Sequence, residues 1–232
     1  MRLIASPVSR MRALWRDTSG VALTEFALSL PLLMTAGLWG VETANLAVTT
    51  MRVNQVAIQI ADNGSRIGDT SSLENRRIFE SDINDLLIGS NIQAGPAIDL
   101  YNHGRVIVSS LEVVPGTDDQ QYIHWQRCKG TKRHPSSYGY EGDGLDGTLV
   151  GMGPPGEEVM AQRGEAVVFV EVSYDYQPLV AGFFGAGREI TSNSAYTVRD
   201  SRDLTEIYQR DPGSPDPVSS CLLHTSYTSV GG

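Results

Sequence analysis

Hydrophobic residues follow three successive patterns along this chain. In the first, residues 21–41 are almost entirely apolar, and no charged residue falls between Phe26 and Val41. A helix of this length is roughly 30 Å long, which is enough to cross the hydrocarbon core of a bilayer. Pro31 lies inside the run, where a membrane helix tolerates proline better than a soluble helix does. The first pattern therefore predicts a membrane-spanning helix.

In the second pattern, the apolar positions narrow to one stripe without a break in helical periodicity. Leu46, Val53 and Ile60 recur every seven residues, which is typical of a helix that packs one face. Gly64 is suited to end the helix. We therefore expect one helix over residues 21–64, with its second half packed on a globular domain. The polar residues that fall largely off the stripe are Glu42, Asn45, Arg52, Asn54 and Gln59.

A second helix is predicted over residues 72–87, where apolar residues again share a face and Gly89 follows as a stop. The third pattern has a period of two and predicts strands. The best-defined strand has Ala166, Val168, Val170, Val172 and Tyr174 on one face, with Glu171 and Ser173 on the other. The four predicted strands span residues 105–114, 121–128, 165–176 and 189–198.

Strands that follow one another without long intervening helices pair in an antiparallel sheet. The predicted fold class is therefore α+β: a long N-terminal transmembrane helix that continues into a domain with a second helix and about four antiparallel strands. We expect three parts, namely a basic leader at residues 1–20, the helix at 21–64 and the domain at 65–232. Residues 129–164 and the tail after Arg210 are rich in glycine or proline and predict irregular structure.

Charge is distributed unevenly along the chain. Residues 1–20 carry four arginines against Asp17, whereas the whole chain has a formal net charge of −9. A basic flank is retained in the cytoplasm, so we expect the acidic domain on the other side of the membrane. An acidic surface repels phosphates, which argues against nucleic acid as a partner.

The chain has two cysteines, Cys128 and Cys221. In an oxidising compartment such a pair usually forms a disulfide, which here would tie the C-terminal tail to the middle of the domain. Two unrelated thiols are the alternative that the sequence leaves open.

Candidate chemistry is sparse. Glu141, Asp143 and Asp146 alternate with glycines, but their spacing does not match a calcium-binding loop, and we interpret them as an acidic surface loop. The four histidines lack the spacing of zinc ligands, and no nucleophile elbow or phosphate-binding loop is present. We interpret the basic residues 127–134 as balancing the neighbouring acidic loop. We therefore expect no enzymatic activity, no metal site and no cofactor.

Glu25 is the one carboxylate within the apolar residues 21–41. An ionised carboxylate in hydrocarbon costs several kcal/mol unless it is paired, so an intramembrane glutamate is a functional candidate. Gly20 lies five residues before it, at the end of the basic leader. A leader, a glycine and a hydrophobic helix with a glutamate five residues in have the layout of a prepilin-type signal.

Residues 17–41, DTSGVALTEFALSLPLLMTAGLWGV, resemble the TadE-like family of minor pseudopilins, which belongs to the tight-adherence (Flp) branch of type IV pilus systems. Residues 170–179, VEVSYDYQPL, are similar to the strand of that family that ends in aromatic residues and proline. The residues that carry the N-terminal resemblance are Gly20, Glu25, Phe26, Ala27, Pro31, Leu32 and Leu33.

The resemblance implies cleavage by a prepilin peptidase between Gly20 and Val21, with Gly20, Val21, Glu25 and Phe26 as processing and assembly residues. It also implies a single-pass bacterial inner-membrane protein with a cytoplasmic N-terminus and a periplasmic domain. Its expected partners are other pilins or pseudopilins, the Tad assembly machinery and membrane lipid. The large domain favours a minor component over the bulk pilin.

One departure limits the resemblance: Val21 replaces the usual phenylalanine or methionine, which leaves N-methylation open. The related TadG-like proteins carry a von Willebrand A domain. The DxSxS motif at Asp69 is incomplete here, because Leu73 takes its last position, and this argues against that domain. The alternative interpretation of the whole chain is an unprocessed, signal-anchored periplasmic scaffold protein of another envelope secretion machine.

Overall fold

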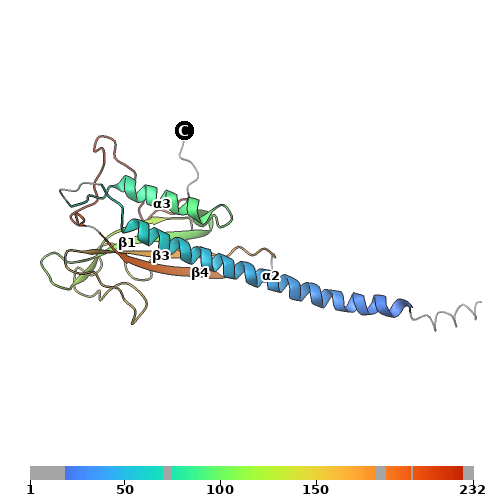
Figure 1. Cartoon of the computed structure of the whole chain (residues 1–232). Helices are drawn as coiled ribbons and strands as arrows, with labels where there is room; N and C mark the ends of the chain where they lie inside the picture. The colour runs from blue at the N-terminus through green and yellow to red at the C-terminus, as the bar shows by residue number, and fades with distance from the viewer. Residues whose placement is uncertain (1–18, 70–74, 181–186, 200, 227–232) are drawn as a thin grey trace, which may run out of the picture.

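The N-terminal helix dominates the shape of the molecule. The computed structural model describes residues 19–69, 75–180, 187–199 and 201–226, so most of the predicted leader lies outside the described residues. Helix α2 (Ser19–Gly64) runs for 46 residues and includes Pro31. Its first half projects away from the rest of the chain, and its second half lies along the domain (Figure 1). The prediction of one helix over residues 21–64 is confirmed.

The domain is built on a four-stranded sheet in the order β2-β1-β3-β4, in which every neighbouring pair is antiparallel. The predicted number of strands and the α+β class are confirmed. Each observed strand begins and ends within one residue of its predicted bounds. The strands are β1 (Gly104–Val113), β2 (Gln121–Lys129), β3 (Ala166–Asp175) and β4 (Glu189–Thr197), and the short helix α4 (Leu100–His103) leads into β1.

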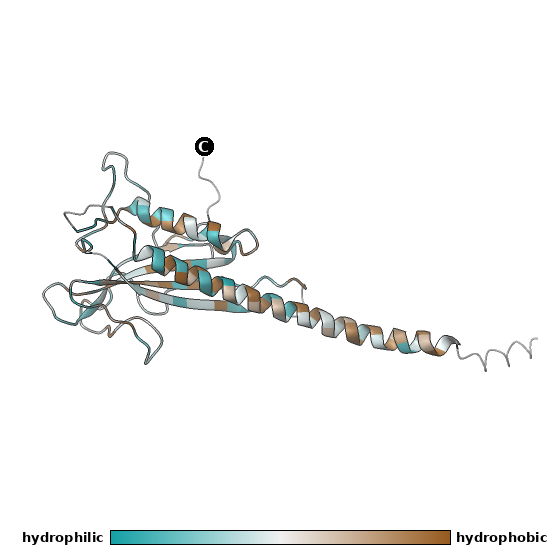
Figure 2. Cartoon of the chain, in the orientation of Figure 1, coloured by the Kyte–Doolittle hydropathy of each residue, from teal (hydrophilic) through white to brown (hydrophobic). Residues whose placement is uncertain are grey.

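The second half of α2 packs on β3, β4 and helix α3 (Glu80–Ala94). Val53 and Ile60 of the predicted stripe are each 1% exposed, and Val56 and Ala57 between them are also buried. Hydropathy changes along the helix, because apolar residues dominate the projecting half, whereas hydrophilic and apolar residues alternate on the half that lies on the domain (Figure 2). The prediction that the stripe faces a globular domain is confirmed.

The predicted bounds of the second helix are wrong. Its predicted start at residues 72–74 lies outside the described residues, but residues 75–79 are not helical and α3 begins at Glu80. Arg76 and Phe79 instead form bridges with Arg202 and Tyr208 of the segment after β4. The extended backbone of Phe79 then starts the helix, with the Asp82 carboxylate accepting its N–H at 3.1 Å.

The helix also continues past Gly89, which was the predicted stop. It ends at Ala94, where Gly95 adopts a positive φ of 76°. Glycine reaches that conformation without strain, which makes Gly95 the better C-terminal cap.

The central strands β1 and β3 are buried on both faces, which the alternation in β3 does not predict. Val168, Val170 and Val172 face the helices as expected, but Val167 and Phe169 belong to a second apolar cluster on the opposite face. That face is covered by the glycine-rich segment 130–165, which contributes Tyr138, Leu149, Met152, Val159 and Ala161. The segment was predicted to be irregular, which it is, but it also covers a core.

One glycine in this segment is required by its close approach to the sheet. Gly144 has a φ of +94°, and a Cβ there would lie 2.2 Å from the backbone oxygen of Gln121. Another residue would need both a strained backbone and a displaced strand.

We expect Ile60→Ala to lower the free energy of unfolding by about 2–5 kcal/mol, because it leaves a cavity between α2 and the sheet. Ile58→Ala is the matched control, since Ile58 is on the same helix but 46% exposed. Urea titration of the full-length protein in detergent, followed by near-ultraviolet circular dichroism, measures both. Equal losses for the two variants would contradict the burial of the stripe.

Candidate functional site

The first half of α2 is uncovered by the domain. Residues 20–41 are all exposed, and the most apolar window of the helix has a mean hydropathy of 1.6 with none of it buried. By its length and composition, α2 is one candidate membrane-spanning helix near the N-terminus. Apolar area of this extent on a protein surface indicates contact with lipid or with other proteins.

The four predicted processing and assembly residues lie on the first turns of α2. Val21 is 50% and Phe26 57% exposed, and Glu25 is also exposed. Glu25 lies four residues after Val21, so both occupy the same face of the helix, one turn apart. A Cβ added at Gly20 would meet no atom within 4 Å. The fold therefore leaves these residues accessible and does not itself require the glycine.

A second glutamate, Glu42, lies at the junction between the uncovered helix and the domain. Glu42 is only 3% exposed. Its Oε1 accepts a hydrogen bond from the hydroxyl of Tyr176, and its Oε2 accepts from the backbone N–H groups of Leu179 at 3.1 Å and Val180 at 3.0 Å. The amide of Asn45 donates to the same tyrosine oxygen at 2.7 Å. Both carboxylate oxygens are thus satisfied by the chain that follows β3.

These contacts fix the point at which the domain meets the uncovered helix. Hydrogen bonds to a carboxylate are stronger than those between neutral groups, and here they attach the segment after β3 to the first turn of α2 that the domain covers. Burial raises the pKa of Tyr176, and its hydrogen bond to the Glu42 carboxylate raises that pKa further. Tyr176 therefore remains a neutral donor at physiological pH.

A role for Glu42 was not predicted, because this residue was assigned to positions off the apolar stripe. The positions 42, 46, 49 and 53 nevertheless continue the stripe one turn toward the N-terminus at helical spacing. Residues 170–179 contained the second signal, since they end in the tyrosine and leucine that bind the carboxylate. A charged residue on a buried stripe at the end of an apolar run indicates a buried polar contact.

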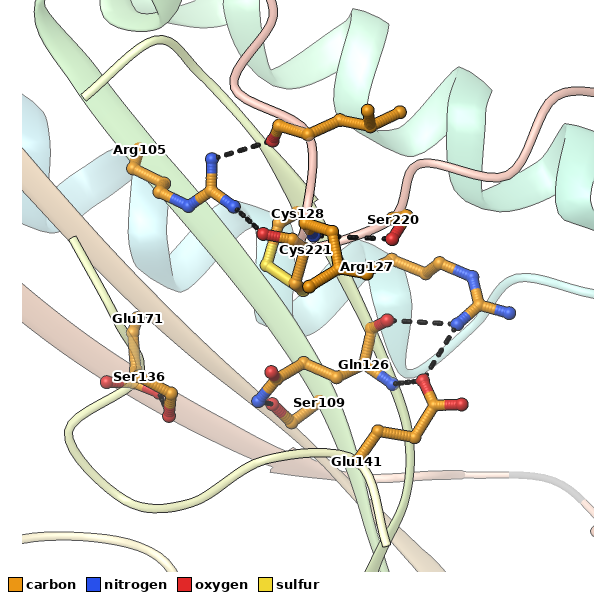
Figure 3. The surroundings of a disulfide bond; sticks show 12 residues. Arg105, Ser109, Gln126, Arg127, Cys128, Ser136, Glu141, Glu171, Ser220 and Cys221 are labelled. Atoms are coloured by element: carbon orange, nitrogen blue, oxygen red, sulfur yellow. Dashed lines mark hydrogen bonds and ion pairs between the residues drawn. A yellow bond between two sulfur atoms is a disulfide. The ribbon is translucent and has the colours of Figure 1, made fainter. Parts of the chain in front are cut away.

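The predicted pairing of the two cysteines is confirmed, since Cys128 and Cys221 form a disulfide (Figure 3). Backbone hydrogen bonds from Cys128 N to Ser219 O and from Gly130 N to Thr225 O continue the attachment on either side. The disulfide therefore holds the tail along the outer edge of β2. It closes a long loop of 93 residues in sequence separation, which restricts the unfolded chain.

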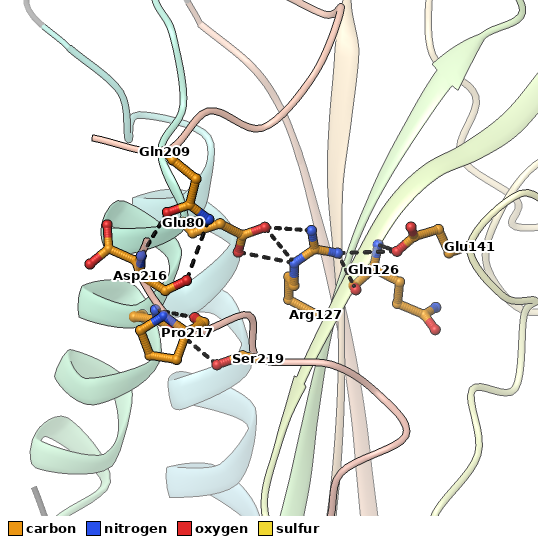
Figure 4. Close-up of polar contacts among 9 residues, drawn as sticks. Glu80, Gln126, Arg127, Glu141, Gln209, Asp216, Pro217 and Ser219 are labelled. Atoms are coloured by element: carbon orange, nitrogen blue, oxygen red, sulfur yellow. Dashed lines mark hydrogen bonds and ion pairs between the residues drawn. The ribbon is translucent and has the colours of Figure 1, made fainter. Parts of the chain in front are cut away.

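Arg127 links three parts of the domain (Figure 4). Its guanidinium binds both carboxylate oxygens of Glu80 on α3, at 2.6 Å from Nη2 and 3.1 Å from Nε, and it lies 3.1 Å from Glu141. Glu80 is buried, whereas Glu141 is exposed. The bidentate pair on the buried side gives the contact a defined geometry.

Of the basic residues 127–134, Arg127 contacts the acidic loop, through Glu141. Lys132 pairs instead with Asp175 and, at 3.0 Å, with Glu189, while His134 Nδ1 lies 3.2 Å from Glu189. These partners lie at the adjacent ends of β3 and β4. The interpretation of the basic cluster as a counterweight to the acidic loop is therefore confirmed for Arg127 and wrong for Lys132 and His134.

The other two carboxylates of the acidic loop are used within its own turns. Asp143 accepts the N–H of Tyr140 at 2.8 Å, and Asp146 accepts both the N–H and the hydroxyl of Thr148. These hydrogen bonds from Thr148 lower the pKa of Asp146. Among the described residues, no group of three or more histidines, cysteines or carboxylates is arranged to hold a metal ion.

Comparison with known proteins adds no relative: no family model matches the chain, and no curated protein or solved structure matches it.

We expect Glu42→Ala to accelerate hydrogen exchange at the amides of Leu179 and Val180 by at least about tenfold, because both lose a charged acceptor. Thr43→Ala is the matched control, since Thr43 is the exposed neighbour on the same helix. Hydrogen exchange of the full-length protein in detergent, read by mass spectrometry, compares the two. Unchanged exchange in Glu42→Ala would show that the junction does not depend on this carboxylate.

Proposed function

We propose that the chain is a TadE-like pseudopilin that takes part in the assembly of Flp-type pili. A prepilin peptidase cleaves it after Gly20, α2 anchors it in the bacterial inner membrane, and its domain lies in the periplasm. Its partners are other pilins or pseudopilins, the Tad assembly machinery and membrane lipid. It acts through binding and not through catalysis.

The observation that carries the proposal is the division of α2. The helix continues without interruption from an uncovered apolar half into a half that packs on the sheet. A subunit with this form can leave its bare half among lipids or among the helices of neighbouring subunits while its domain remains folded. The residues of the resemblance, Gly20 to Leu33, all lie on the bare half or directly before it.

Glu25 has a physical role under this proposal. Cleavage after Gly20 gives Val21 a free ammonium group, and this group is also costly to bury alone. Glu25 lies about 6 Å further along the helix axis. A neighbouring helix shifted by one turn therefore brings its Glu25 level with the amine, and each charge offsets the desolvation cost of the other.

We expect Gly20→Leu to block processing. The fold has room for a side chain at this position, so the loss would come from the peptidase and not from unfolding. Gly40→Leu is the matched control, since it also meets no atom within 4 Å. After coexpression with a prepilin peptidase, intact mass shows whether the protein begins at Val21 or at Met1.

Two outcomes of that experiment would count against the proposal. Cleavage of Gly20→Leu at the same bond would show that processing does not require the glycine. A native chain that still begins at Met1 would favour the alternative, an unprocessed signal-anchored scaffold of another envelope machine.

We expect Glu25→Gln to leave membrane insertion and cleavage intact but to reduce pilus assembly severalfold or more, because the ammonium of a neighbour loses its counter-charge. Thr24→Val is the control, since its hydroxyl bonds only to the carbonyl of Val21 in its own helix, at 2.8 Å. Shed pilin quantified from cells that carry each variant is the measurement. Normal piliation with Glu25→Gln would show that assembly does not depend on an ion pair between Glu25 and the ammonium group of a neighbouring Val21.

A further inference from the structure

A cavity of about 250 Å³ lies between the sheet and the disulfide-bonded tail. Arg105 and Gln126 of β1 and β2 line it together with Arg133, His134 and Tyr140 of the segment after β2, and His224 of the tail. Its lining includes no aspartate or glutamate. A cavity lined with cationic groups is unexpected in a chain whose net charge is −9.

Arg105 is the buried cation of this cavity and is only 2% exposed. It donates from Nη1 to the carbonyls of Gly130 at 3.1 Å and Leu223 at 3.0 Å, and from Nη2 to the carbonyl of Cys221 at 2.6 Å (Figure 3). Its Nε has no hydrogen-bond partner, and no carboxylate of the described residues forms an ion pair with it.

Carbonyl dipoles compensate this charge only in part. A cation taken out of water is costly unless a counter-charge offsets the loss of hydration. The effect is visible in the side chain itself, because burial lowers the pKa of Arg105. An anion next to the guanidinium would supply both the missing charge and an acceptor for Nε.

Arg133 provides a second cation without a partner. It is exposed, and within the described part of the chain its side chain forms no ion pair or hydrogen bond. Its guanidinium therefore has its full set of donors available at the wall of the cavity.

His224 adds a further donor. Its Nδ1 lies 2.9 Å from Arg105 Nη1 and 3.3 Å from the carbonyl oxygen of Lys132. Arginine only donates, so Nδ1 accepts in the shorter of these two contacts, and Nε2 then carries the proton of the neutral ring.

The hydroxyl of Tyr140, which is also exposed, adds another donor. No carboxylate among the residues that the structure describes lines the cavity itself, and the neighbouring Glu189 and Glu171 are bound to His134 and Ser136.

We propose that this cavity is a binding site for a small oxyanion, such as phosphate or a carboxylate, held by Arg133 at its wall and neutralising Arg105 at its base. Guanidinium groups favour such anions because their planar donors match two oxygens at once. The volume admits an anion of this size together with water. The inference is independent of the proposed role in pilus assembly, since it concerns the face of the sheet opposite to α2.

The test is calorimetric titration of the full-length protein in detergent with inorganic phosphate, at an ionic strength held constant with chloride. We expect saturable binding of one phosphate per chain. Arg133→Gln should weaken it by about tenfold, the effect of losing one charge-assisted hydrogen bond. Arg52→Gln is the matched control, because Arg52 is an exposed arginine on α2 and does not line the cavity.

A second titration, with succinate, distinguishes a phosphate site from a carboxylate site. The anion that binds with the lower dissociation constant identifies the class of ligand that the site prefers. Arg105→Lys keeps the buried charge but loses the planar donors, so it should weaken phosphate binding as well. If this variant does not fold, the result for Arg133→Gln is sufficient to test the proposal.

A heat of binding that does not saturate with phosphate, or a phosphate affinity that is unchanged in Arg133→Gln, would overturn the proposal. Arg105 would then serve only to hold the tail.

Discussion

The structure depends on one helix that must satisfy two surroundings without a break in its backbone hydrogen bonds. Residues 20–41 expose apolar side chains on every side, whereas beyond Glu42 the buried apolar residues form one stripe, which packs on the sheet and α3. The hydrophobic effect scales with the apolar area removed from water. The sheet therefore packs on the amphipathic half of α2, where the apolar face is buried and the polar face of the helix stays in contact with water. The carboxylate of Glu42 lies at this change and fixes the sheet to the helix there.

A second feature is that the central strands β1 and β3 are buried on both faces, whereas the edge strand β4 remains partly exposed. Helices α2 and α3 cover one face, and segment 130–165 covers the other. This segment has little regular structure of its own. Contacts at the edge of the sheet hold the irregular parts of the chain in place. Arg127 joins β2 to Glu80 and Glu141, and the disulfide joins β2 to the tail. Strand β2 is therefore the element to which the irregular parts of the chain are attached.

Local patterns in the sequence were sufficient for most of the fold and for little of the site. The strands, the length of α2 and its buried stripe follow from periodicity, because packing of one face repeats at the period of the element. The start of α3 could not be predicted, since Arg76 and Phe79 pair with residues after β4 that are more than 120 positions away in the sequence. Glu42 and Arg105 were missed for the same reason: their partners, Val180 and Leu223, are distant in sequence.

The tail held by Cys221 also determines how the molecule can meet copies of itself. A strand at the border of a sheet offers unpaired N–H and C=O groups that invite another strand, and unprotected borders lead to uncontrolled stacking. Here the amides of Cys128 and Gly130 are already bonded to Ser219 and Thr225. The acidic loop bonds to the same border through the backbone of Ile123. Together, this loop and the disulfide-bonded tail close that flank of the sheet to lateral growth.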